Sequence, residues 1–291
     1  MQKQMKITYH YNSGFSVRMG STLLVFDYWE GEGRRLPEVG RLNRQMLSAF
    51  EQIYVFVSHA HPDHFSEVIY EWREDLPVTY VVSNDMPVGT RGKRLIPLDT
   101  LTLSQDISVK GFESTDLGVA FLVRAYGLNI FHAGDLNLWH WRQESSLREI
   151  EAAENAFYQA IAPLKGERID VAMFPVDPRQ GTYYDAGANH FVHTQKPRVF
   201  IPMHWQDRSE VAIDFARRTK TPQTEVLALT RPGEMAIVTF SDKALDIHII
   251  EPPKDMADLP IAPMRRPERQ ALDPHAEDPF ADTDLPVELD E

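Results

Sequence analysis

The 291-residue sequence contains no cysteine. This absence excludes disulfide bonds, thiolate metal sites and a cysteine nucleophile, so any metal ion must be held by nitrogen and oxygen. It also fits a reducing compartment. No run is long and apolar enough to span a bilayer, and the start does not resemble a secretory signal. We therefore expect a cytoplasmic protein that does not enter a membrane.

The sequence also has fewer basic than acidic residues. The net charge is −13, and residues 251–291 carry 12 Asp or Glu against 4 Lys or Arg, which leaves −5 for residues 1–250. A mildly acidic surface repels phosphate backbones on average, so nucleic acid is a disfavoured partner. A small-molecule substrate is favoured instead, and a homo-oligomer stays open.

The composition changes near residue 250. Eight of the twenty prolines lie in residues 251–291, together with most of the acidic excess. Such a segment cannot bury enough apolar surface to offset the chain entropy lost on folding. We therefore expect one domain over residues 1–250 and an acidic, proline-rich tail over residues 251–291, which trails from the domain or wraps around it.

The order of predicted elements favours two packed sheets. Ser146 and Glu149 have the spacing of a helix capping box, and the alanine-rich stretch behind them predicts a helix to about Ala162. Alternating or continuous apolar patterns predict strands over residues 6–10, 15–19, 22–28, 53–57, 78–82, 107–112, 119–125, 128–131, 171–174, 199–202, 234–240 and 244–250. Further helices are predicted over residues 42–50, 65–74 and 211–218, and between the strands at 171–174 and 199–202. This order fits an α+β fold with two β-sheets flanked by helices.

The strongest chemical signal follows the predicted strand at 53–57. Four potential metal ligands lie there within six residues: His59, His61, Asp63 and His64. Residues two apart in an extended segment face the same way, so His59 and His61 can offer imidazoles to one ion. The turn at Pro62 then lets Asp63 and His64 point to a second ion. The competing interpretation is a surface histidine cluster of fortuitous composition.

At these residues the sequence resembles the metallo-β-lactamase superfamily, whose His-x-His-x-Asp-His signature they match. Two later matches fall in the same order, Gly134-Asp135 after one predicted strand and Pro202-Met203-His204 after another. The resemblance covers about residues 6–240 and implies a four-layer αββα sandwich with two divalent metal ions. Zinc is the first choice, and manganese or iron are alternatives. The implied metal ligands are His59, His61, Asp63, His64, Asp135 and His204, with Asp135 bridging the two ions.

One departure concerns the first metal site. No histidine lies between His64 and His132, where the superfamily usually places the residue that completes this site. Glu113 or Asp116 could substitute through an oxygen ligand, which would favour manganese or iron over zinc. Equally, the first site could be weak or empty.

Several single residues have two interpretations each. His132 either orients a ligand or is satisfied by backbone groups at a strand end. His140 either lines a substrate pocket or belongs to a packed aromatic cluster. For His190 and His193, three apart on a predicted helix, solvated surface is favoured over metal binding. Arg179 either binds an anionic substrate group or is a solvated loop arginine.

The ligand set predicts a metal-dependent hydrolase that uses a metal-activated water. Asp63 would also orient the nucleophile or shuttle its proton. The substrate class stays open among small esters, lactones, amides and phosphodiesters, because a fold does not dictate its reaction. The interval from Asp135 to His204 is too short for an added nucleic-acid-processing domain. Within the hydrolases, the runner-up is a nuclease-type phosphodiesterase. From other classes, the alternatives are a metal-binding sensor or scaffold with an incomplete first site and an iron redox protein.

Overall fold

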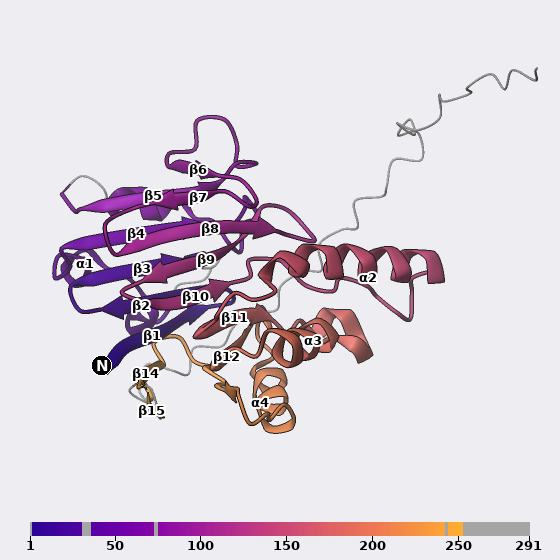
Figure 1. The fold of residues 1–291 in the computed structure, drawn as a ribbon. Coiled ribbons are helices and arrows are strands. Elements are labelled where there is room, and N and C mark those ends of the chain that lie inside the picture. The colour runs from indigo at the N-terminus through magenta and orange to yellow at the C-terminus, as the bar shows by residue number, and fades with distance from the viewer. Residues whose placement is uncertain (1, 31–35, 73–74, 242–243, 253–291) are drawn as a thin grey trace, which may run out of the picture. The chain divides into compact units, whose positions relative to one another are not determined.

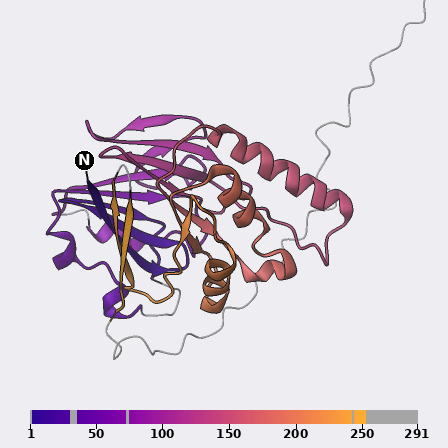
Figure 2. The same cartoon turned by 60° about the horizontal axis from the view of Figure 1, so that its bottom comes forward.

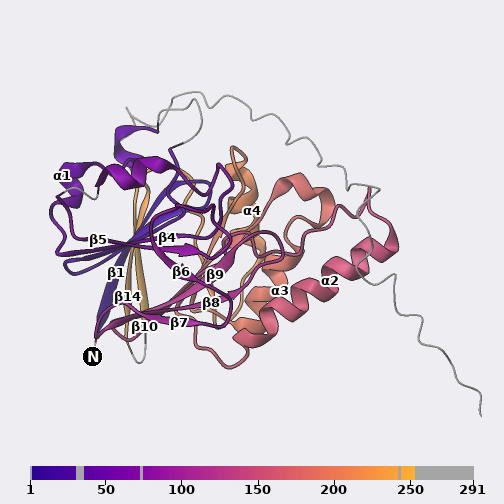
Figure 3. The same ribbon diagram turned by 90° about the horizontal axis from the view of Figure 1, so that it is seen from above.

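The computed structural model describes residues 2–30, 36–72, 75–241 and 244–252. Within these ranges the strands form two sheets that pack face to face, with helices on both outer faces (Figures 1 and 3). The layers run from α1 (Arg44–Leu47) through both sheets to α2 (Leu147–Ile161). This is the expected four-layer αββα sandwich. Nearly all of the predicted tail, from residue 253 on, lies outside the described residues.

The first sheet has the strand order β15-β14-β1-β2-β3-β4-β5-β6. Its strands are β1 (Lys3–Tyr11), β2 (Gly14–Met19), β3 (Thr22–Phe26), β4 (Gln52–Val57), β5 (Val78–Ser83), β6 (Lys93–Leu95), β14 (Met235–Phe240) and β15 (Leu245–Ile250). The pairs β3–β4 and β4–β5 are parallel, so their connections cross one face of the sheet. These connections contain α1 and the 3₁₀ helix η2 (Glu67–Trp72).

The second sheet has the order β13-β12-β11-β10-β9-β8-β7. Its strands are β7 (Thr100–Thr102), β8 (Ile107–Glu113), β9 (Val119–Ala125), β10 (Leu128–His132), β11 (Val171–Pro175), β12 (Val199–Met203) and β13 (Glu225–Val226). The strands β10, β11 and β12 are parallel. The chain between them forms α2 and α3 (Ala186–Gln195), and α4 (Ser209–Arg218) follows β12; these three helices gather on one side of the sandwich (Figures 1 and 2).

Burial on both faces explains why the central strands are continuously apolar. On β3, Leu24 and Phe26 belong to the core between the sheets, which extends to α2, α3 and α4. Leu23 and Val25 point the other way, into a smaller core beneath α1 and η2. Every residue of β3 is buried as a result.

Most predicted elements are present, but the helices over the first sheet are shorter than predicted. The helix expected over residues 42–50 is only the four-residue α1, which Asn43 caps by accepting a hydrogen bond from Met46 N–H. The segment at 65–74 forms the 3₁₀ helix η2 within its described part. The short strands β6, β7 and β13 were not predicted, because two or three residues are too few to show a period. No helix in the described ranges has the length and apolar character needed to cross a membrane.

Candidate metal centre

The predicted metal ligands lie at the carboxyl ends of parallel strands from both sheets. The histidine motif follows β4 in the first sheet, whereas Asp135 follows β10 and His204 directly follows β12 in the second (Figure 1). Because the sheets pack face to face, these three segments meet at one edge of the sandwich. The structure brings together all six predicted ligands: His59, His61, Asp63, His64, Asp135 and His204.

One group of ligand atoms surrounds Oδ1 of Asp135. His64 Nε2 lies 3.0 Å from this oxygen and His204 Nε2 lies 3.4 Å from it. Asp63 Oδ2 is 3.3 Å from His204 Nε2 and 3.8 Å from His64 Nε2. Two imidazoles and two carboxylates therefore converge here, and we call this group the second site.

A neighbouring group surrounds the other oxygen of Asp135. His59 Nε2 lies 3.4 Å from Asp135 Oδ2, and His61 Nδ1 lies 3.8 Å from the same atom. The two histidines are 2.9 Å apart at these nitrogens. We call this group the first site. Asp135 thus presents one carboxylate oxygen to each site, which is the arrangement of a bridging ligand.

Unsatisfied buried atoms test whether a cation fits here. His64 Nε2, His204 Nε2 and Asp135 Oδ1 are buried and make no hydrogen bond within the described residues. A buried polar atom without a partner costs about 1–3 kcal/mol, so such atoms are rare. Three of them converge on one point, and a bound cation would satisfy all three.

Asp27 orients the histidines that follow β4. This fully buried carboxylate, directly after β3, accepts hydrogen bonds from His64 Nδ1 at 2.8 Å and from Ser58 Oγ at 2.6 Å. Because the Ser58 hydroxyl donates to Asp27, it must accept from His59 Nδ1, 2.9 Å away. Both imidazoles therefore carry a proton on Nδ1, which leaves Nε2 as the nitrogen that each directs to the centre. Carboxylates that hold metal-binding histidines in this way tune metal affinity.

Asp177 orients His204 in the same way as Asp27 orients His64. It lies two residues after β11 and accepts a hydrogen bond from His204 Nδ1 at 3.0 Å. Arg179 pairs with the same carboxylate through Nε, at 2.8 Å from Oδ2. Arg179 is therefore not a freely solvated loop residue, since its side chain is only 34% exposed.

Sequence reasoning did not single out Asp27 or Asp177. Both follow apolar strands, as the histidine motif does, and this position was the signal available. A carboxylate at a strand end is common, however, and only the pairing of β3 with β4 and of β11 with β12 places these two beside histidines.

The electrostatics of the centre favour added positive charge. Burial alone would raise the pKa of the Asp135 carboxyl, but the adjacent His64 and His204 imidazoles hold it well below its ordinary value. Burial would lower the pKa of His204, whereas the Asp135 and Asp177 carboxylates raise it to about 9. The buried carboxylates thus draw positive charge to the imidazole nitrogens, and a metal cation would supply it without a proton.

Two further histidines, His132 and His140, make contacts typical of a structural role. His132 Nε2 donates to the Ser13 carbonyl at 2.8 Å, and its Nδ1 accepts from Gly134 N–H at 3.2 Å, so backbone groups satisfy it. His140 is buried next to Tyr183, with ring centroids 6.2 Å apart.

On α3, His190 packs its ring 4.9 Å from that of Tyr158, and His193 is exposed. Neither His190 nor His193 belongs to a group of potential metal ligands in the described residues.

The two residues proposed to replace the missing histidine differ in position. The Asp116 carboxylate has an oxygen within 4.8 Å of ligand atoms of His61 and Asp135. Glu113, the last residue of β8, is exposed and belongs to no such group among the described residues.

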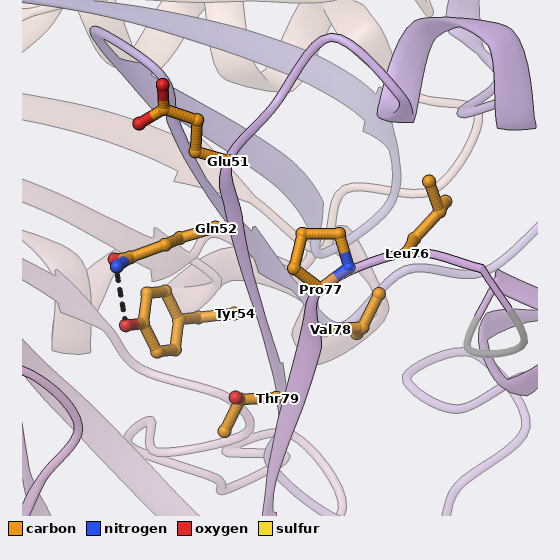
Figure 4. A pocket seen from close by; sticks show the side chains of 7 residues that line it. All are labelled: Glu51, Gln52, Tyr54, Leu76, Pro77, Val78 and Thr79. Carbon is orange, nitrogen blue, oxygen red and sulfur yellow. Dashed lines mark hydrogen bonds between the residues drawn. The ribbon is translucent and has the colours of Figure 1, made fainter.

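A separate hollow lies at the other end of the first sheet. Its lining residues are Glu51, Gln52, Tyr54, Leu76, Pro77, Val78 and Thr79 (Figure 4). Gln52 and Val78 are the first residues of β4 and β5, whereas the histidine motif follows the last residue of β4. The hollow is therefore distant from the candidate centre along the strands, and no histidine lines it.

The chain resembles known proteins in sequence and in fold. No protein-family model matches the chain. A UPF0173 metal-dependent hydrolase of Opitutus terrae is 25% identical over 259 residues, which cover 79% of this chain and 98% of that protein. Igni18, a metallo hydrolase of Ignicoccus hospitalis, has a similar structure with a TM-score of 0.59, at 19% identity over 82% of this chain and 100% of its own.

A second similar structure is that of CmlA, a diiron β-hydroxylase of Streptomyces venezuelae. Its TM-score is 0.50 at 16% identity, over 81% of this chain and 54% of CmlA. The fold alone therefore does not fix the reaction. In fold, in sequence and in its histidine motif, the chain is thus similar to metal-dependent hydrolases of the metallo-β-lactamase superfamily.

Proposed function

We propose that this protein hydrolyses a small ester, lactone, amide or phosphodiester with a water activated by two divalent cations. The cations would be held by His59, His61, Asp63, His64, Asp135 and His204. The observation that carries the proposal is the convergence of three buried atoms without hydrogen-bond partners, His64 Nε2, His204 Nε2 and Asp135 Oδ1.

A pair of bound cations would lower the pKa of a water and polarise the carbonyl or phosphoryl oxygen of the substrate. Asp63 is the group of this chain best placed to handle the proton. Its side chain is 21% exposed, so it can reach solvent, and its Oδ2 accepts a hydrogen bond from Asn12 Nδ2 at 3.0 Å. Held by Asn12, Asp63 would orient the attacking water or accept its proton.

Aromatic side chains beside the centre support a small substrate. The Trp139 ring lies 6.0 Å from that of His204, and Trp139 Nε1 donates to the Asp135 carbonyl at 2.7 Å. Trp141 stacks on Trp139 and is 40% exposed. These rings offer a flat apolar surface for the body of a substrate, and the partly exposed Arg179 adds a positive charge near it.

The donor set limits the choice of metal. Only imidazole nitrogens and carboxylate oxygens are available, because the chain has no cysteine. Zinc accepts this set, and so do manganese and iron. We propose zinc as the first choice and manganese or iron as the alternatives.

The test uses the whole chain purified without a histidine tag. Metal content is measured by elemental analysis, and turnover is screened on chromogenic esters, lactones and phosphodiesters before and after chelation. Two equivalents of metal and turnover that is lost on chelation and restored by metal would support the proposal. Metal binding without turnover on any substrate would instead favour a sensor or scaffold, and a visible band that changes on reduction would favour a redox protein.

A further inference from the structure

We propose that the Asp116 carboxylate is the fourth ligand of the first site and decides which metal that site prefers. The inference rests on the proposed metal-dependent function. It concerns a residue outside the six ligands named above.

Without a further ligand the first site has one protein ligand fewer than the second. It has His59 Nε2, His61 Nδ1 and one oxygen of Asp135. Zinc takes four ligands in most protein sites, and a catalytic site needs three protein ligands besides a water; manganese and iron usually take more. Since Asp135 is shared with the second site, the first site has only two ligands of its own.

Asp116 fills this gap by its position. Its carboxylate has an oxygen within 4.8 Å of ligand atoms of both His61 and Asp135. His61 is 40% exposed on its side chain, and Asp116 is exposed, so the two meet at the solvent side of the site. The Asp116 carboxylate is therefore placed where it could bind the same cation as His61 and Asp135.

The loop that carries Asp116 is fixed on both sides. Hydrogen bonds to three other segments hold it. Thr115 Oγ1 donates to the Asn137 carbonyl and accepts from Asn137 N–H at 2.9 Å, Gly118 N–H donates to Asp85 Oδ2 at 2.6 Å, and Val119 N–H donates to Ser58 O at 3.2 Å. The last of these ties the loop to the residue that precedes His59. The position of Asp116 over the histidine motif is therefore set by the packing of the two sheets.

Gly118 shows how closely the loop approaches the motif. Its φ is +81°, and a Cβ there would lie 1.9 Å from the Ser58 carbonyl oxygen and 2.7 Å from His59 Cβ. Only glycine permits this approach, because any side chain would push the loop away from His59. The approach keeps Asp116 beside the first site.

With Asp116 included, the two sites have matching donors. Each would have two imidazoles, one carboxylate of its own and one oxygen of Asp135. The first would use His59, His61 and Asp116, of which His61 and Asp116 are grouped with Asp135, and the second would use His64, His204 and Asp63. A carboxylate in place of a third imidazole makes the first site harder in character. The first site should therefore accept manganese or iron more readily than it would with a third histidine in place of Asp116.

The test measures Mn²⁺ binding to the whole chain by elemental analysis after equilibrium dialysis and by electron paramagnetic resonance. The wild type should bind two equivalents and give the spectrum of a coupled pair. Asp116→Asn keeps the size of the side chain but weakens the ligand. Removing a residue that merely orients a ligand costs 10–100-fold in affinity, so first-site affinity should fall by at least about 100-fold. The spectrum should then be that of isolated Mn²⁺.

Glu113→Gln is the matched control, because it neutralises a nearby exposed carboxylate of the same stretch and should bind like the wild type. Asp116→His should keep two equivalents of Zn²⁺ and lower the affinity for Mn²⁺ relative to Zn²⁺. Two equivalents of coupled Mn²⁺ in Asp116→Asn, with wild-type affinity, would overturn the inference and leave the proposed hydrolase function standing. A wild type that binds neither Mn²⁺ nor Zn²⁺ would overturn both.

Discussion

The Asp27 carboxylate accepts a hydrogen bond from His64 Nδ1 at 2.8 Å, and both side chains are fully buried. The parallel pairing of β3 with β4 makes this contact, because Phe26 and Phe56 are paired residues and each strand delivers its next residues to the same edge. Sheet register thereby determines which nitrogen of His64 faces Asp135. The contact can be tested by substitution.

Asp27→Asn should lower the metal affinity of the second site by roughly 10–100-fold. An amide cannot accept all three hydrogen bonds that Asp27 accepts, from Ser58 N–H, Ser58 Oγ and His64 Nδ1, so the His64 ring is no longer held. Competition with a metallochromic chelator measures the affinity. Asp170→Asn is the control, because Asp170 is equally buried but precedes β11, at the end remote from the centre. Equal affinity losses in both variants would contradict an orienting role.

Asp63→Ala should reduce turnover by roughly 100-fold or more while leaving the fold intact. The side chain is a candidate ligand and the proposed proton acceptor; apart from its approach to His64 and His204 within the centre, its contact is one hydrogen bond from Asn12. Losing that bond should cost only about 1 kcal/mol of the free energy of unfolding. Steady-state kinetics and denaturant unfolding measure the two effects. Unchanged turnover in the purified variant would refute the assigned role.

Gly118→Ala should destabilise the protein by roughly 3 kcal/mol or more, through a left-handed backbone and an overlap with Ser58. It should also weaken metal binding, since the displaced segment carries His59. Gly20→Ala is the matched control: Gly20 has a φ of +61°, and a Cβ there meets nothing within 4 Å. The control should lose only about 1–2 kcal/mol, the cost of the backbone alone. Denaturant unfolding of both variants gives the difference, and equal losses would argue against a tight contact at Ser58.

His10 should make stability fall in mild acid. It is buried in the first sheet, where its Nδ1 donates to the Gly40 carbonyl at 2.7 Å and its Nε2 accepts from Ser16 Oγ at 2.8 Å. Burial lowers the pKa of His10 to about 4, although the bond to Gly40 opposes this. The unfolded chain binds this proton near pH 6.5, so between about pH 6.5 and 4 unfolding takes up a proton and becomes easier as the pH falls.

The stabilisation is complete above about pH 6.5 and should decrease by up to about 3 kcal/mol by pH 4. Denaturant unfolding across this range measures it. His10→Gln should have a shallower acid slope than the wild type, even if it is less stable throughout. A substitution of the exposed His248 on β15 should leave the slope unchanged. A wild-type slope in His10→Gln would show that another group is responsible.

The sequence by itself determined the local features. The four predicted ligands His59, His61, Asp63 and His64 lie within six residues of the chain, so their proximity follows from the sequence alone. The capping box at Ser146 forms as predicted and starts α2. Apolar patterns located the long strands, because alternation and continuous burial are written directly in the order of residues. The division into a domain over residues 1–250 and a tail over 251–291 stays a prediction from composition.

The tertiary structure decided how distant residues reach the motif. The resemblance had already named Asp135 and His204, which come from the second sheet, but only the strand pairing shows that Asp27 and Asp177 contact the histidines. The structure likewise separates Asp116 from Glu113, which the sequence treated alike. The physical reason is that sequence patterns report the period of a local segment, whereas contacts between segments depend on register and sheet packing. Those are set by the whole core at once.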